Sequence, residues 1–109
     1  MSVSELFKET RLPVLAAPLF IISYPELVIA QCKAGVIGSF PALNARPAEE
    51  LEKWIVKISS ELEQYKKDNP DEIVSSFAVN QICHSSNDRL ERDVDVCVKH
   101  KVPMVITSL

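Results

Sequence analysis

Short apolar runs alternate along this chain with longer segments in which apolar residues recur every three or four positions. The runs predict strands, and the three-and-four spacing predicts amphipathic helices. The predicted strands are residues 13–18, 36–40, 73–79 and 102–107, and the predicted helices are residues 23–34, 47–67 and 88–99. A short helical lead-in within residues 2–11 precedes them, and its Leu6 and Phe7 are expected to cover the bottom of a sheet.

Strands that alternate with helices in units of about 30 residues indicate a parallel sheet with right-handed crossovers. A closed barrel of eight such units needs about 250 residues, whereas this chain has 109. The pattern therefore leaves two architectures open. One is a small open α/β domain, and the other is the front half of a barrel.

The first run, residues 13–18, carries no charge and begins and ends on proline. Such a run is typical of a strand that is buried on both faces. Pro18 has no N–H group, so it is expected where ladder pairing stops. The small side chains of Ala16 and Ala17 leave room for a flat group to approach the backbone. The apolar residues 19–22 then form a loop, which we expect either to flank a ligand or to pack against a neighbour.

Local signals mark the next helix and strand. Ser23 is predicted to cap the helix, with Glu26 as its capping-box partner. Gly35 is expected to end this helix. Gly38 lies inside the following strand, where glycine indicates close approach by a backbone or ligand, or else a bulge or tight packing.

The two later helices are each expected to bury one apolar stripe. The stripe of residues 47–67 consists of Leu51, Trp54, Ile55, Ile58, Leu62 and Tyr65. The stripe of residues 88–99 consists of Leu90, Val94, Cys97 and Val98. Trp54 lies at the centre of the first stripe and is therefore expected to be buried.

Composition narrows the class of protein. The chain is 47% hydrophobic and 25% charged with a net charge of −3, which indicates a globular domain without the basic surface that nucleic acid requires. No apolar stretch reaches the roughly 18 residues needed to cross a bilayer, and residues 1–10 lack the layout of a signal peptide. We therefore expect a cytoplasmic protein that binds neither nucleic acid nor membrane.

The cysteine pattern predicts neither a disulfide framework nor a metal site. The chain has three cysteines, an odd number, and none of them are in C-x-x-C spacing. A disulfide framework or a structural zinc site would need a different pattern. Cys32 and Cys97 fall on apolar helix faces and are expected to be core thiols. Cys83 lies near the end of a strand, where its role is left open.

The candidate chemistry lies at the strand ends. Parallel strands bring their carboxyl ends together, where ligands of such proteins bind. These ends are Ala17-Pro18-Leu19, Ser39-Phe40, Asn80-Gln81 and Thr107-Ser108. Apolar surface, an amide pair and hydroxyls suit an uncharged ring with polar edges. His84 follows on the same side, but without a visible acid partner it is expected to be a loop hydrogen-bonder, and no catalytic residue is assigned.

At these strand ends the sequence resembles the nitronate monooxygenases, formerly called 2-nitropropane dioxygenases, which are flavin enzymes built on a TIM barrel. The matching segments are Pro13–Pro18, Pro25-Glu26-Leu27, Ala34–Ser39, Val79-Asn80-Gln81 and Val102–Ser108. They follow the order and spacing of the family along nearly the whole chain. The resemblance implies an α/β fold in which this parallel (β/α) repeat forms the first four strands of a TIM barrel, with residues 1–109 as its amino-terminal part.

The resemblance also implies a cofactor and its contacts. Ala17, Pro18 and Leu19 would pack against FMN, largely through backbone, and Asn80 would hydrogen-bond the flavin. Leu19 stands where the family usually has methionine. The substrates would be an alkyl nitronate and O2, with a carbonyl compound and nitrite as products. The catalytic histidine and the phosphate-binding loops of the family belong to later strands, beyond residue 109, so this chain is expected to be inactive alone.

Two alternatives to this assignment stay open. Related flavin barrels, such as the enoyl reductases and the IMP-dehydrogenase-like proteins, share the Ala-Pro of the first strand. A non-catalytic α/β module is the other alternative, either a binding domain or one that forms homo-oligomers through exposed strand edges.

Overall fold

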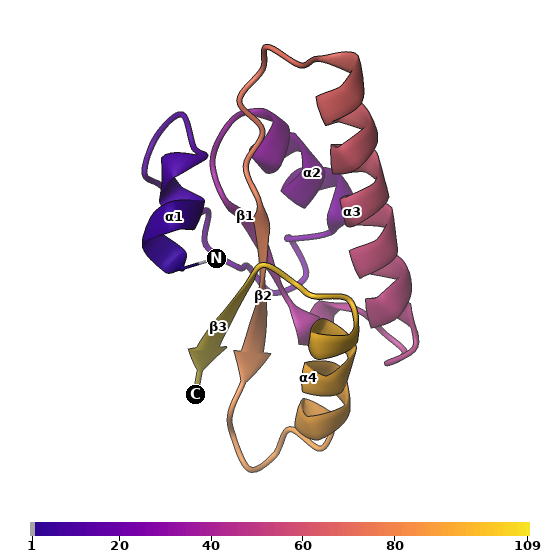
Figure 1. Ribbon diagram of the computed structural model, residues 1–109. Coiled ribbons are helices and arrows are strands. Elements are labelled where there is room, and N and C mark those ends of the chain that lie inside the picture. The colour runs from indigo at the N-terminus through magenta and orange to yellow at the C-terminus, as the bar shows by residue number, and fades with distance from the viewer. Residues whose placement is uncertain (1) are drawn as a thin grey trace.

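A parallel sheet of three strands forms the centre of the computed structural model, which describes residues 2–109 (Figure 1). The strands are β1 (Gly38–Pro41), β2 (Phe77–Ile82) and β3 (Met104–Ser108), in the order β1-β2-β3. The helices are α1 (Val3–Lys8), α2 (Pro25–Lys33), α3 (Glu50–Asp68) and α4 (Leu90–Lys99), with a 3-10 turn, η1, at Ala42–Asn44. The predicted parallel β/α repeat is confirmed, and this small α/β domain is compatible with part of a TIM barrel.

The sheet separates two apolar clusters. On its outer face, helices α2, α3 and α4 enclose the larger cluster, whereas α1 lies against the opposite, inner face (Figure 1). The inner cluster consists of Leu6, Ile37, Ala78 and Met104, with Phe7 packed against it. Ile37, Ala78 and Met104 lie at or beside the amino ends of the three strands, so the expected cover of the bottom of the sheet by Leu6 and Phe7 is confirmed.

The first predicted strand is the largest departure from the sequence pattern. Residues 13–18 make only one parallel bridge, between Leu15 and Ile37, supported by hydrogen bonds from Ala16 N to Ile37 O and from Ile37 N to Val14 O. Val14 is 46% exposed, so the prediction of a strand buried on both faces is wrong. Within residues 2–109 this segment has a sheet neighbour on one side only, which leaves its other edge unpaired.

The last strand is also less buried than its sequence suggests. Val105 in β3 is 43% exposed, although Met104 beside it is buried. β3 lies at the edge of the sheet, so its outward side chains have no covering helix in the described chain. The apolar run of β3 places apolar side chains on both faces of the sheet. The described chain buries mainly the inner face, which carries Met104.

The helix starts differ from the capping signals. Tyr24 occupies the N-cap position of α2 and makes no side-chain cap bond, with Pro25 as the first helical residue. Ser23 is instead fully buried, and its hydroxyl accepts a hydrogen bond from Leu19 N at 2.8 Å. The predicted capping box is wrong because Ser23 closes the preceding loop. α3 likewise begins at Glu50, after a turn closed by Glu50 N and Pro47 O.

The stripe of α3 is largely confirmed, but that of α4 is rotated. Leu51, Ile55, Ile58 and Leu62 are buried, whereas Trp54 and Tyr65 are only partly buried. In α4, Cys97 is buried as expected, but Val98 is 71% exposed and Asp93 is completely buried. The buried ion pair that Asp93 makes, described below, fixes which face of α4 meets the sheet.

Both glycines serve the helix–strand connection. Gly35 has φ +92° and ends the segment after α2, as predicted. A Cβ at Gly38 would stand 2.7 Å from Val28 O and 3.1 Å from Cys32 Sγ. The close approach expected at Gly38 is therefore made by the backbone of α2.

Candidate functional site

The carboxyl ends of the strands meet at one edge of the sheet. In the register, Pro41 of β1 lies opposite Asn80 of β2, which lies opposite Ile106 of β3. The parallel bridge at Leu15 sends residues 17–19 out at the same end. Pro18 and Asn80 thus belong to the same edge, which we call the carboxyl edge.

The two predicted amides point to opposite faces. β2 extends to Ile82, so Asn80 and Gln81 lie within the strand and alternate across the sheet. Gln81 belongs to the outer face, where its Nε2 lies 3.4 Å from Cys97 Sγ and its Oε1 has no partner. Asn80 shares the inner face with Ala78. Only Asn80 can therefore serve a ligand on the inner face.

Asn80 carries an unused donor. Its side chain is mostly buried, at 7% exposed, and its Oδ1 accepts a hydrogen bond from Ser108 Oγ at 3.1 Å. Its Nδ2 makes no hydrogen bond with residues 2–109. Because buried amides normally satisfy both ends, this N–H pair is available to a ligand at the carboxyl edge.

The segment that faces it across β1 is also open. Ala17 is exposed and Pro18 partly buried, and the Ala17 N–H makes no backbone hydrogen bond within residues 2–109. Leu19 differs, because its N–H donates to Ser23 Oγ and its carbonyl accepts from Asn44 Nδ2. The Leu19 N–H and carbonyl are therefore already hydrogen-bonded within the loop, while its exposed side chain is open to a ligand.

The apolar loop of residues 19–22 is held by Asn44, a residue that sequence reasoning missed. Asn44 is buried; its Oδ1 accepts from Ile21 N at 3.0 Å, and its Nδ2 donates to Leu19 O and Ser23 O at 3.1 and 2.9 Å. Ile21 has φ +67°, which is rare for a β-branched residue. The sequence shows Asn44 only as an asparagine in a loop between apolar segments. Its partners are backbone groups more than 20 residues away, and no sequence pattern identifies them.

The remaining titratable candidates are structural. His84 is exposed, and its Nδ1 lies 2.8 Å from Ser86 Oγ, as expected for a loop hydrogen-bonder. Burial raises the pKa of Cys32 to about 11 and also raises the pKa of Cys97. These thiols are inert core residues, as predicted, whereas Cys83 is exposed. Among residues 2–109 no cluster of three metal-binding side chains occurs, and no helix is long and apolar enough to cross a membrane.

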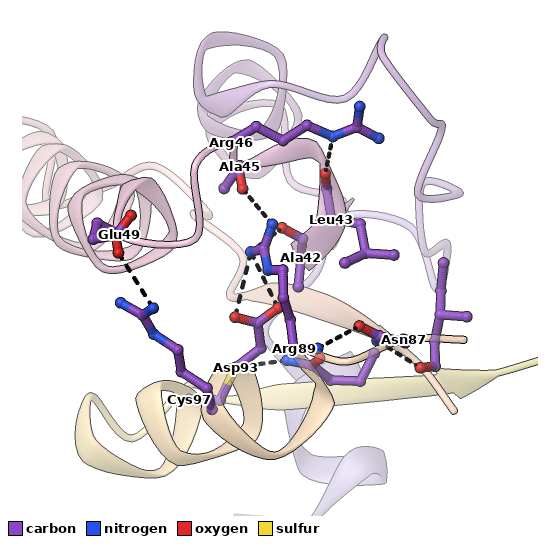
Figure 2. Close-up of polar contacts among 12 residues, drawn as sticks. Ala42, Leu43, Ala45, Arg46, Glu49, Asn87, Arg89, Asp93 and Cys97 are labelled. Atoms are coloured by element: carbon purple, nitrogen blue, oxygen red, sulfur yellow. Dashed lines mark hydrogen bonds and ion pairs between the residues drawn. The ribbon is translucent and has the colours of Figure 1, made fainter. Parts of the chain in front are cut away.

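A buried ion pair supports the carboxyl edge from the outer side. Arg89 reaches from the start of α4 to the carbonyls of Ala45 and Ala42, at 2.7 and 3.3 Å, and pairs with Asp93 at 3.1 Å (Figure 2). Burial raises the pKa of Asp93, against the lowering effect of Arg89. The pair joins α4 to the turn η1, which follows β1 and ends at Asn44.

Comparisons with known proteins show the fold. No protein-family profile and no curated protein sequence matches the chain. Among solved structures, a FabK point mutant from Thermotoga maritima is similar, with a TM-score of 0.71 and 22% sequence identity. The match covers 98% of this chain and 31% of that chain. The chain therefore shares its β/α arrangement with about a third of a longer protein.

Proposed function

We propose that this chain is the amino-terminal part of an FMN-dependent oxidoreductase barrel, and that its carboxyl edge contacts the flavin ring. The observation that carries the proposal is the pair of unused N–H donors at one edge, on Ala17 and on Asn80. The rim of a flavin ring presents carbonyl oxygens and ring nitrogens that accept such bonds. Pro18 and the side chain of Leu19 would supply apolar contact beside them.

The residues present fit the ring and not the phosphate. Flavin barrels hold phosphate with backbone N–H groups of glycine-rich loops and a helix N-terminus. The chain has two glycines, of which Gly35 packs against Arg11 and Gly38, the first residue of β1, packs against α2, so neither lies at the carboxyl edge. A bound flavin would supply the electron chemistry, while these residues would orient the ring and shield it from water.

For the complete protein we propose nitronate monooxygenase activity, in which an alkyl nitronate and O2 give a carbonyl compound and nitrite. The second candidate is an enoyl reductase, because that class of flavin barrel shares the Ala17-Pro18 pair that ends the first strand segment. Two assays on the protein encoded by the complete reading frame distinguish these activities. Nitrite release from a nitronate would indicate the monooxygenase, and NAD(P)H oxidation by an enoyl thioester would indicate the reductase. Activity in neither assay would contradict both.

The ring contact can be tested on the chain itself. FMN and lumiflavin, the ring system without the ribityl phosphate, are titrated against purified chain while flavin fluorescence is followed. We expect both to bind weakly and with similar affinity, because neither gains a phosphate contact. Asn80→Ala should weaken both, and Ser59→Ala, on the outer side of α3, should weaken neither.

Two outcomes would contradict this proposal. Failure of both flavins to bind the folded chain would show that the carboxyl edge is not a flavin-ring site. Stoichiometric FMN binding at low micromolar concentration, or nitrite release by the isolated chain, would show that residues 1–109 form a complete site. A non-catalytic module that pairs through the edges of residues 14–16 and β3 would instead appear as stable dimers in sedimentation without flavin binding.

A further inference from the structure

A separate cavity of about 190 Å³ lies between the loop of residues 19–24 and the start of α3. Its lining consists of Phe20, Ile21, Tyr24, Asn44, Arg46, Glu50 and Trp54. Three aromatic rings, one guanidinium and one carboxylate therefore surround it. We call it the aromatic cavity, and neither Ala17 nor Asn80 of the proposed flavin contact lines it.

Aromatic contacts and hydrogen bonds shape the walls of the aromatic cavity. The ring of Trp54 lies 4.8 Å from that of Tyr24 and 5.6 Å, edge-on, from that of Phe40, measured between ring centroids. The three hydrogen bonds of Asn44 hold the opposite wall, and they keep Ile21 in its unusual backbone conformation. Backbone strain that the surroundings maintain in this way is characteristic of ligand-binding segments.

The two charged groups at the cavity retain free hydrogen-bonding capacity. Arg46 uses only its Nε, which donates to Leu43 O at 3.0 Å, and its guanidinium carbon lies 5.2 Å from the Phe20 ring centroid. Figure 2 shows this guanidinium beyond the Leu43 carbonyl, away from the Arg89–Asp93 pair. Glu50 contacts Lys53 through Oε1 alone, at 3.2 Å. Within residues 2–109, Arg46 and Glu50 form no ion pair with each other.

We propose that the aromatic cavity binds a small zwitterion of the class of free α-amino acids with an apolar side chain. The free N–H groups of Arg46 suit a carboxylate. Glu50 and the faces of the aromatic rings suit an ammonium group. The volume lies below the roughly 300–1,000 Å³ of pockets for drug-sized ligands, which restricts the ligand to a small metabolite. This inference does not depend on the flavin assignment.

Trp54 gives a direct measurement, because it is the single tryptophan of the chain and lines the cavity. Leucine is titrated while tryptophan emission is followed, beside two analogues with the same side chain and one charge each. These are 3-methylbutylamine, which lacks the carboxylate, and 4-methylpentanoate, which lacks the ammonium group. We expect a saturable change with leucine and at least about tenfold weaker binding of each analogue, the effect of losing a charged hydrogen bond.

Matched variants complete the test. Arg46→Gln and Glu50→Gln should each weaken leucine binding about tenfold or more. Arg11→Gln and Glu72→Gln, which break an exposed ion pair outside the cavity, should leave it unchanged. Equal binding of either analogue, or full binding by Glu50→Gln, would overturn the zwitterion assignment. No saturable change up to about 10 mM in folded wild-type chain would overturn the site itself.

Discussion

Replacing Asp93 with asparagine tests the buried ion pair most directly. The Asp93 side chain is 1% exposed and that of Arg89 is 18% exposed, so the pair is largely removed from water. Asparagine has nearly the same shape and keeps one acceptor, but it removes the charge that compensates Arg89. The substitution therefore isolates the electrostatic contribution of the pair from its packing.

The expected loss follows from this geometry. Removing one partner of a buried ion pair costs about 3–5 kcal/mol, because the other charge is left uncompensated. Arg89 keeps its bonds to the Ala42 and Ala45 carbonyls and has some contact with water, so we expect a smaller loss than for a fully buried pair, about 2–3 kcal/mol. That is a large part of the roughly 5–15 kcal/mol that stabilises an ordinary domain.

Urea unfolding followed by Trp54 fluorescence measures this loss. The matched control is Glu49→Gln at the start of α3, which breaks an exposed pair with Arg92 of α4; the two side chains are 63% and 54% exposed. It should leave the free energy of unfolding essentially unchanged, because exposed ion pairs contribute little to stability. A loss below about 1 kcal/mol for Asp93→Asn would show that the pair does not fix α4 against the sheet.

Three further outcomes are expected in the same unfolding assay. Gly38→Ala should cost about 1–3 kcal/mol, because the new methyl meets the Val28 carbonyl at 2.7 Å; a neutral result would mean that α2 moves freely. Trp54→Ala, followed by circular dichroism, should cost about 2 kcal/mol, below the 3–5 kcal/mol of a fully buried tryptophan, because Trp54 is only partly buried. Hydrogen bonds from Lys99 and His100 lower the pKa of Glu52 to about 2 from 4.5. The folded pKa lies below the unfolded value, so this stabilisation is complete well above pH 4.5 and is lost as the pH falls toward 2; Glu52→Gln should flatten that acid limb, and an unchanged slope would contradict the contacts.

The sequence by itself determined the order of the elements and their parallel arrangement. Apolar spacing and glycine positions are local signals. They predicted the stripe of α3 and the stop at Gly35, because helix geometry is set by residues that are neighbours in the chain. The same signals failed where burial depends on distant partners. Residues 13–18 and β3 contain apolar runs. Whether their side chains are exposed depends on a neighbouring strand or helix that covers them, and the apolar pattern does not show whether such a neighbour is present.

Tertiary structure alone decided the polar contacts that shape the candidate sites. Ser23 has a suitable side chain for a helix cap, yet Leu19 N competes for its hydroxyl, and the folded loop decides between the two. Asn44 and Ile21 lie 23 residues apart and meet only when the loops after two neighbouring segments of the sheet come together. Asp93 is buried on a helix whose apolar residues suggested another face, because Arg89 compensates its charge while the carbonyls of Ala42 and Ala45 accept other N–H groups of the same guanidinium. Polar partners, some near in sequence and some distant, thus fixed what hydrophobic periodicity could not, because a polar side chain can be buried only where a partner meets it.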